Sequence, residues 1–65
     1  TGEITIHAGT DQILEVNLYS IAGELIQTRR VKVQTLRMTL PDTPGTYLLD
    51  VKTNRGRRIE KILRQ

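Results

Sequence analysis

Residues 36–51, LRMTLPDTPGTYLLDV, decide the fold. Apolar and polar side chains alternate on both sides of the central PDTPG, which is the pattern of β-strands with one buried face. Proline has no backbone N–H to donate to a sheet, so it ends the first of these strands. The two apolar sets are Leu36, Met38 and Leu40, and Tyr47, Leu49 and Val51. The stretch therefore predicts two strands joined by a turn, with Tyr47 in the core and Asp50 facing outward.

The same alternation continues toward both ends of the chain. It predicts further strands over residues 3–7, from about Ile13 to residue 19, over residues 24–33 and over residues 57–64. In the second of these, the buried face is expected to be Leu14, Val16 and Leu18. Polar residues interrupt the run 24–33, which predicts an exposed or bulged edge strand. Because no long window has helical spacing, we expect an all-β fold of six to seven antiparallel strands in two packed sheets.

Composition limits the classes of protein that the chain can belong to. It has 65 residues, 37% of them hydrophobic and 26% charged, which predicts a small folded domain. With 0 Cys it has neither a disulfide framework nor a thiolate metal site. It has no apolar run of about 20 residues, so we do not expect it to span a membrane. Since it starts at Thr1 without Met, we expect a fragment of a longer secreted protein.

The sequence offers little catalytic chemistry. His7 is the only histidine, so a catalytic triad or a histidine metal cluster would depend on it alone, and a surface position at a strand end is the simpler interpretation. The glycines occur singly at predicted turns and form no phosphate-binding loop. Asp42 and Asp50 would be the candidate carboxylate pair, but Asp42 lies in a proline-rich turn where Asp caps local N–H groups, and Asp50 is expected to face outward. We therefore expect no enzyme activity, no cofactor and no metal.

Charge is distributed unevenly along the chain. Residues 1–28 contain four acidic residues and no Lys or Arg, whereas residues 29–65 contain all 10 basic residues and three acidic ones. Such a basic half can contact nucleic acid, an anionic lipid or an acidic protein. The nucleic-acid candidates are Arg55, Arg57, Arg58, Lys61 and Arg64. Stacking platforms are missing, because Phe and Trp are both 0, and no nucleic-acid partner is expected.

Five segments in order, LYSIAGEL (18–25), LRMTLP (36–41), GTYLLDV (45–51), NRG (54–56) and IEKILR (59–64), carry a family resemblance. The chain resembles the type A C-terminal sorting domain of type IX secretion cargo. The structural motif residues of this resemblance are Gly23, Leu40, Pro41, Gly45, Tyr47 and Gly56. Two differences are that the chain lacks the Pro-Asn-Pro segment that commonly opens such domains, and that it ends on Gln65 where Lys or Arg is usual.

The resemblance implies an immunoglobulin-like sandwich over residues 1–65, acting as a single sorting domain at the end of a cargo protein. It implies passage through the periplasm, contact with outer-membrane shuttle and sortase components, and delivery to the cell surface or secretion. The alternative is an immunoglobulin-like or fibronectin-like accessory or adhesion module. An edge strand would also offer a route to a dimer.

The terminal strand is the expected recognition element. Its apolar residues fall on both parities, as though a second surface were covered, and basic residues flank them. The recognition residues predicted are Arg58, Ile59, Lys61, Ile62, Leu63 and Arg64. The structural alternative is that Ile59 and Leu63 only close the sandwich while the basic residues keep the domain in solution.

Overall fold

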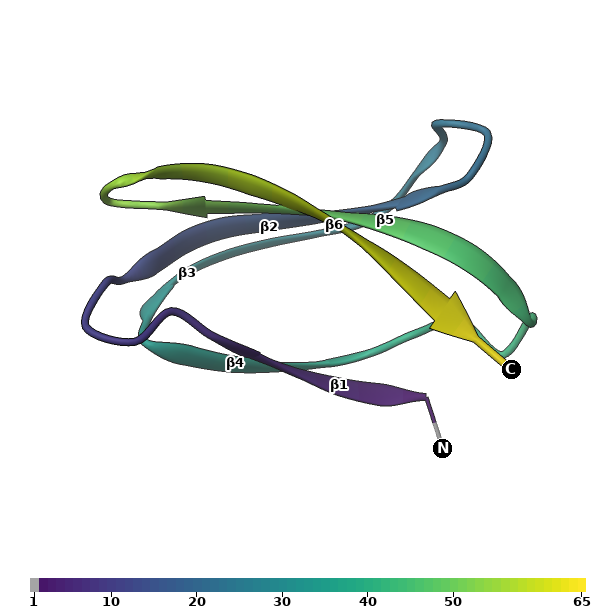
Figure 1. The fold of residues 1–65 in the computed structure, drawn as a ribbon, viewed down its shortest axis with the longest axis horizontal. Helices are drawn as coiled ribbons and strands as arrows, with labels where there is room; N and C mark the ends of the chain where they lie inside the picture. The colour runs from purple at the N-terminus through teal and green to yellow at the C-terminus, as the bar shows by residue number, and fades with distance from the viewer. Residues whose placement is uncertain (1) are drawn as a thin grey trace.

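Six strands form two antiparallel sheets in the computed structural model, which describes residues 2–65, and those residues contain no helix. The strands are β1 (Glu3–His7), β2 (Ile13–Ser20), β3 (Leu25–Val33), β4 (Thr35–Thr39), β5 (Gly45–Thr53) and β6 (Gly56–Arg64). β1 pairs with β4, and the other four strands form a sheet in the order β3-β2-β5-β6. Figure 1 shows the two sheets packed face to face. The predicted all-β sandwich is confirmed.

The core lies between the two sheets. Its ten buried hydrophobic residues are Ile6, Ile13, Val16, Leu18, Leu36, Met38, Leu40, Tyr47, Leu49 and Val51. The central strands β2 and β5 supply six of them, and the small sheet with the residue after β4 supplies the other four. Full burial of one such aliphatic side chain contributes roughly 1.5–3 kcal/mol. The predicted burial of both alternating sets in residues 36–51 is confirmed.

A β-bulge near Leu14 corrects the face predicted for β2. Ile13 pairs with Thr53, and Glu15 pairs with Lys52. Because the two β5 residues are consecutive, Leu14 is an extra residue on β2 without a partner on β5. Such an insertion reverses the side-chain alternation locally. As a result Ile13 is fully buried at 0% exposure, whereas Leu14 is only partly buried. The inward set is therefore Ile13, Val16 and Leu18, and the expectation for Leu14 was wrong.

β3 is an edge strand with irregular pairing, as the sequence predicts. Two register shifts interrupt its ladder with β2. On the outer face, the Asn17 amide donates to Glu15 Oε2 at 3.0 Å, and Arg30 Nε lies 3.3 Å from Glu15 Oε1. The hydrogen bond from Asn17, together with the positive charges of Arg30 and Lys52, lowers the pKa of Glu15. At pH values above the ordinary carboxyl pKa, Glu15 is ionised and these contacts stabilise the register of β2 and β3. This stabilisation is lost as the pH falls through the lowered pKa of Glu15.

The turn between β4 and β5 is closed by Tyr47. This ring is 6% exposed, and its hydroxyl donates to the backbone carbonyl of Thr43 at 2.5 Å. The aromatic ring thereby fills the core while its polar end satisfies a turn carbonyl. Gly45, with φ of 147°, starts β5 in a backbone conformation that favours glycine. The turn residues and the core are thus linked through one side chain.

Replacing Tyr47 separates its two roles. Tyr47→Ala should lower the free energy of unfolding by roughly 3–5 kcal/mol because it empties a core site. Tyr47→Phe keeps the ring and should cost about 1 kcal/mol, the contribution of one hydrogen bond. Urea denaturation of both variants measures the difference. A melting temperature for Tyr47→Ala within a degree or two of the parent would show that the ring is not part of the core.

The bulge in β2 predicts unequal effects for two neighbouring residues of similar size. Ile13→Ala should destabilise the protein by roughly 2–5 kcal/mol, and Leu14→Ala by about 1 kcal/mol, because only Ile13 is fully buried. Chemical denaturation of the two variants tests this directly. Equal losses of stability, or a larger loss for Leu14→Ala, would contradict the bulge and support the uninterrupted alternation expected from the sequence.

Candidate functional site: the C-terminal strand

β6 lies at an edge of the four-stranded sheet and has one strand partner, β5. The ladder runs from Thr53 paired with Gly56 to Gly45 paired with Arg64. Within the described residues, no strand pairs with the other side of β6. An edge strand of this kind keeps half of its backbone hydrogen-bonding groups free.

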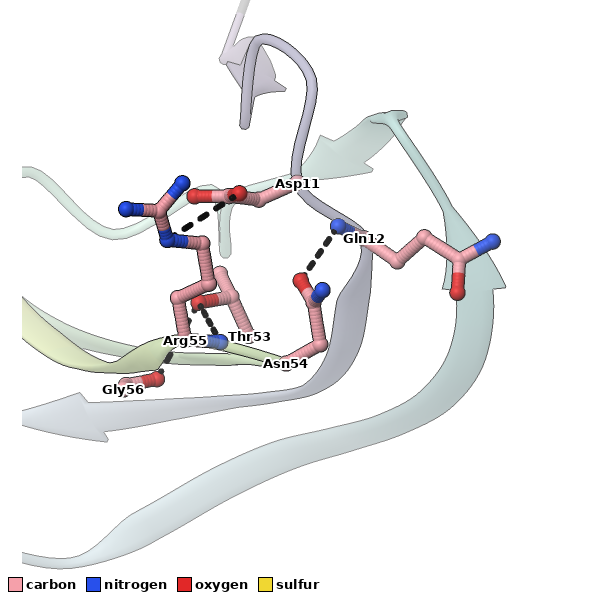
Figure 2. Close-up of polar contacts among 6 residues, drawn as sticks. All are labelled: Asp11, Gln12, Thr53, Asn54, Arg55 and Gly56. Carbon is pink, nitrogen blue, oxygen red and sulfur yellow. Dashed lines mark hydrogen bonds and ion pairs between the residues drawn. The ribbon is translucent and has the colours of Figure 1, made fainter.

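Hydrogen bonds and an ion pair between two loops hold the beginning of β6 in place (Figure 2). Gln12 N donates to Asn54 Oδ1 at 2.8 Å, and Asn54 N donates to Gln12 O at 3.1 Å. Arg55 Nε lies 3.7 Å from Asp11 Oδ1. The turn between β5 and β6 is therefore tied to the loop before β2, and β6 leaves it in a fixed direction.

The six predicted recognition residues lie on this one strand but on both of its faces. Ile59, Lys61 and Leu63 lie on the outer face, where Ile59 and Leu63 are each 64% exposed. On the inner face, Ile62 is partly buried and packs against the core. Arg58 and Arg64 share its parity, and Arg58 pairs with the exposed Glu60 at 3.1 Å. Ile62 therefore closes the sandwich, whereas Ile59 and Leu63 face outward.

Two partly buried residues that the sequence interpretation did not select lie beside this outer surface. Leu48 pairs in register with Lys61 on one side and Tyr19 on the other. Both Leu48 and Tyr19 are partly buried. Their parity, opposite to that of the core residues on the same strands, was the available signal. The outer face of β6 thus continues into an apolar surface on β5 and β2.

Asp50 lies on the outer face, as its parity predicts, but it is buried there. Its side chain is 11% exposed, and Arg57 Nε lies 3.1 Å from Asp50 Oδ1 in an ion pair that lacks hydrogen-bond geometry. In register it stands between Asn17 on β2 and Ile59 on β6. A buried carboxylate requires a cation or hydrogen-bond donors. The prediction that Asp50 faces outward is correct, but neither its burial nor the structural role of Arg57 was predicted from the sequence.

Arg57 and Arg58 provide a matched pair for testing that role. Arg57→Met should lower the free energy of unfolding by about 1–2 kcal/mol, because it leaves the buried Asp50 carboxylate without its cation. Arg58→Met removes an ion pair between two exposed groups and should cost less than about 0.5 kcal/mol. Thermal denaturation compares the two. An equal loss in both variants would mean that the Asp50 contact adds nothing beyond a surface pair.

The remaining motif residues lie in turns or at strand ends. Gly23, with φ of 91°, lies in the β2–β3 turn, and Gly56 begins β6. Leu40 is buried directly after β4, and Pro41 follows it. His7 is exposed at the end of β1, with Nδ1 3.4 Å from the Thr35 hydroxyl. Over residues 2–65, no three His, Cys, Asp or Glu side chains gather closely enough to hold a metal ion, and no helix is long and apolar enough to cross a membrane.

The fold is that of a small all-β domain whose last strand, β6, forms an open edge of the larger sheet. The model of the secretion system C-terminal sorting domain family matches residues 1–65, the whole chain, and the chain therefore belongs to this family. It is a C-terminal sorting signal for type IX secretion, which leads to the cell surface or to release. No curated protein and no solved structure was found to match the chain. The predicted resemblance is confirmed, and nothing favours the accessory-module alternative.

Family membership also sets the general nature of the activity. Sorting domains of this family are in general non-catalytic, and they interact with the type IX secretion machinery. Their effect depends on being bound by that machinery.

Proposed function

We propose that β6 is the part of the domain that the export machinery recognises, through Arg58, Ile59, Lys61, Ile62, Leu63 and Arg64. The observation that carries this proposal is the position of β6 at a sheet edge with Ile59 and Leu63 exposed beside basic side chains. An extended segment of a partner pairs with such an edge through main-chain hydrogen bonds, and alternate side chains select the partner. Residues 1–65 act as one non-enzymatic sorting unit at the end of a longer secreted protein.

The charge of β6 supports a partner with an acidic surface. Besides Arg58, the strand carries Arg57, Lys61 and Arg64 against the single acidic residue Glu60. Exposed charges at the rim of an interface steer the encounter and make its rate sensitive to salt. In our proposal the first partner is an outer-membrane shuttle protein, met in the periplasm. A sortase component then acts on the cargo.

Dimerisation through an edge strand is the competing use of β6. The other edge of the same sheet, β3, carries Arg29, Arg30 and Lys32 and no acidic residue. Two copies joined through β6, or through β6 and β3, would place like charges side by side, which is unfavourable. The charges therefore favour a different, acidic protein over a second copy.

Surface substitutions on β6 test the proposal without disturbing the core. The domain is fused to a periplasmic reporter in a host with a working type IX system, and surface delivery is measured. We expect Ile59→Ser/Leu63→Ser and Lys61→Ala each to reduce delivery severalfold. Because Ile59 and Leu63 are largely exposed, their replacement should leave the melting temperature nearly unchanged.

Matched variants on the opposite edge provide the control. Ile21→Ser/Leu25→Ser removes two comparably exposed apolar side chains, and Lys32→Ala removes one exposed charge of β3. These variants should be delivered at the parental level. If folded β6 variants reach the surface as well as the parent does, β6 is not the recognition element.

A further inference from the structure

A groove of about 350 Å³ opens between the start of β1 and the end of β6. Its lining includes Gly2, Ile4, Leu40, Ile62 and Arg64, from both ends of the chain. In Figure 1, the C-terminal end of β6 runs toward the side of the molecule where β1 lies. Among residues 2–65, neither β1 nor β6 pairs with a strand on this side. The groove therefore occupies an open side of the sandwich between two unpaired strand edges.

The positively charged guanidinium of Arg64 lies in this groove and has few ionic or hydrogen-bond partners. Its side chain is only 18% exposed, and its Nε is buried with no hydrogen-bond partner among the described residues. The nearest carboxylate, on the fully exposed Asp42, has Oδ1 3.9 Å from Arg64 Nη2, which is beyond hydrogen-bond distance. Glu3 also lines the groove, but its carboxylate accepts from Arg37 Nη2 at 3.1 Å. The guanidinium thus has unused donors in a partly buried position.

Gly2 makes room for this guanidinium. A Cβ atom at position 2 would overlap the Arg64 guanidinium, and φ of 82° at Gly2 disfavours any side chain. Next to the charge, Ile4 and Ile62 are partly buried and provide an apolar floor. The groove therefore combines one buried cation, an apolar floor and backbone edges on both sides.

We propose that this groove binds an extended acidic segment of a partner protein, with one carboxylate accepting hydrogen bonds from Arg64. An extended segment fits because strand edges flank the groove, and its apolar side chains would cover Ile4 and Ile62. A carboxylate fits because guanidinium pairs with it through two parallel hydrogen bonds. The inference deepens the proposed function, on which it rests, since Ile62 and Arg64 belong to both sites.

Synthetic peptides test the carboxylate preference in vitro. The probe is a capped hexapeptide of alternating valine and threonine with one central glutamate, and its counterpart has glutamine there. Titration into the isotope-labelled 65-residue domain, followed by NMR, gives both the affinity and the residues affected. We expect the glutamate peptide to bind about tenfold more tightly, as one charged hydrogen-bonded pair allows, with shifts centred on residues 2–4 and 62–64.

Variants then assign the preference to Arg64. Arg64→Gln should abolish the difference between the two peptides, and Arg64→Lys should retain only part of it. Gly2→Ala displaces the guanidinium without changing the sequence of β6 and should also abolish the difference between the two peptides. Arg29→Gln, which removes the same charge from the β3 edge, should leave it unchanged. Circular dichroism and melting temperature confirm that each variant is folded.

The outcomes separate the two proposals. Equal affinity for the two peptides, shifts centred on β3, or no binding of the glutamate peptide at millimolar concentration overturns the groove inference, even if β6 variants fail in export. If Gly2→Ala loses the glutamate preference but is delivered to the surface normally, the groove binds acidic segments without serving export. Loss of both in Gly2→Ala, with Arg29→Gln normal in both assays, supports the groove as the contact made during sorting.

Discussion

In this protein a two-stranded sheet packs against a four-stranded sheet, and most other features depend on this difference in width. The ten buried side chains lie mainly on the central strands β2 and β5 and on the small sheet. No cysteine is present to strengthen the interior. The outer strands β3 and β6 contribute only the partly buried Val31 and Ile62 to the core. They also keep apolar side chains exposed, and Ile59 and Leu63 of β6 lie on the face turned away from the small sheet. The larger sheet has open edges because, within the described residues, no further strand pairs with β3 or β6.

Open edges normally invite association between copies, and here charge opposes it. Both outer strands of the larger sheet are basic, and most of their charged groups remain exposed. Repulsion between like edges is a common way in which proteins avoid sheet-to-sheet aggregation. The same charges leave the edges available to an acidic partner. The basic side chains of β3 and β6 thus both limit self-association and favour binding of an acidic partner.

Alternation in the sequence predicted the positions of the strands because their inner faces are lined by apolar residues at every second position. Residues 36–40 and 47–51 follow this rule without interruption, and their burial matched the prediction. The bulge at Leu14 could not be predicted, since one inserted residue reverses the face without a distinctive residue to mark it.

Features that depend on contacts between strands far apart in the sequence could not be predicted either. The burial of Asp50 depends on Asn17, Ile59 and Arg57, which come from two other strands. The groove depends on β1 meeting the end of β6, two segments at opposite ends of the chain. The sequence did identify β6 as the strand with apolar residues on both parities. It could not tell which of these residues faces the core.

The terminal strand can separate from its sheet with little loss of core packing. β6 gives the interior only the partly buried Ile62, whereas β5 gives it Tyr47, Leu49 and Val51. Separating β6 from β5 breaks ladder hydrogen bonds but leaves the packing of the other five strands in place. Segments with so few buried contacts open locally at a small fraction of the free energy of global unfolding. Opening starts at the C-terminal end, because Asn54 and Gln12 hold the hairpin end. Amide hydrogens near Leu63 should therefore exchange with solvent long before those of β2, and a partner can gain access to the strand while the rest of the domain stays folded.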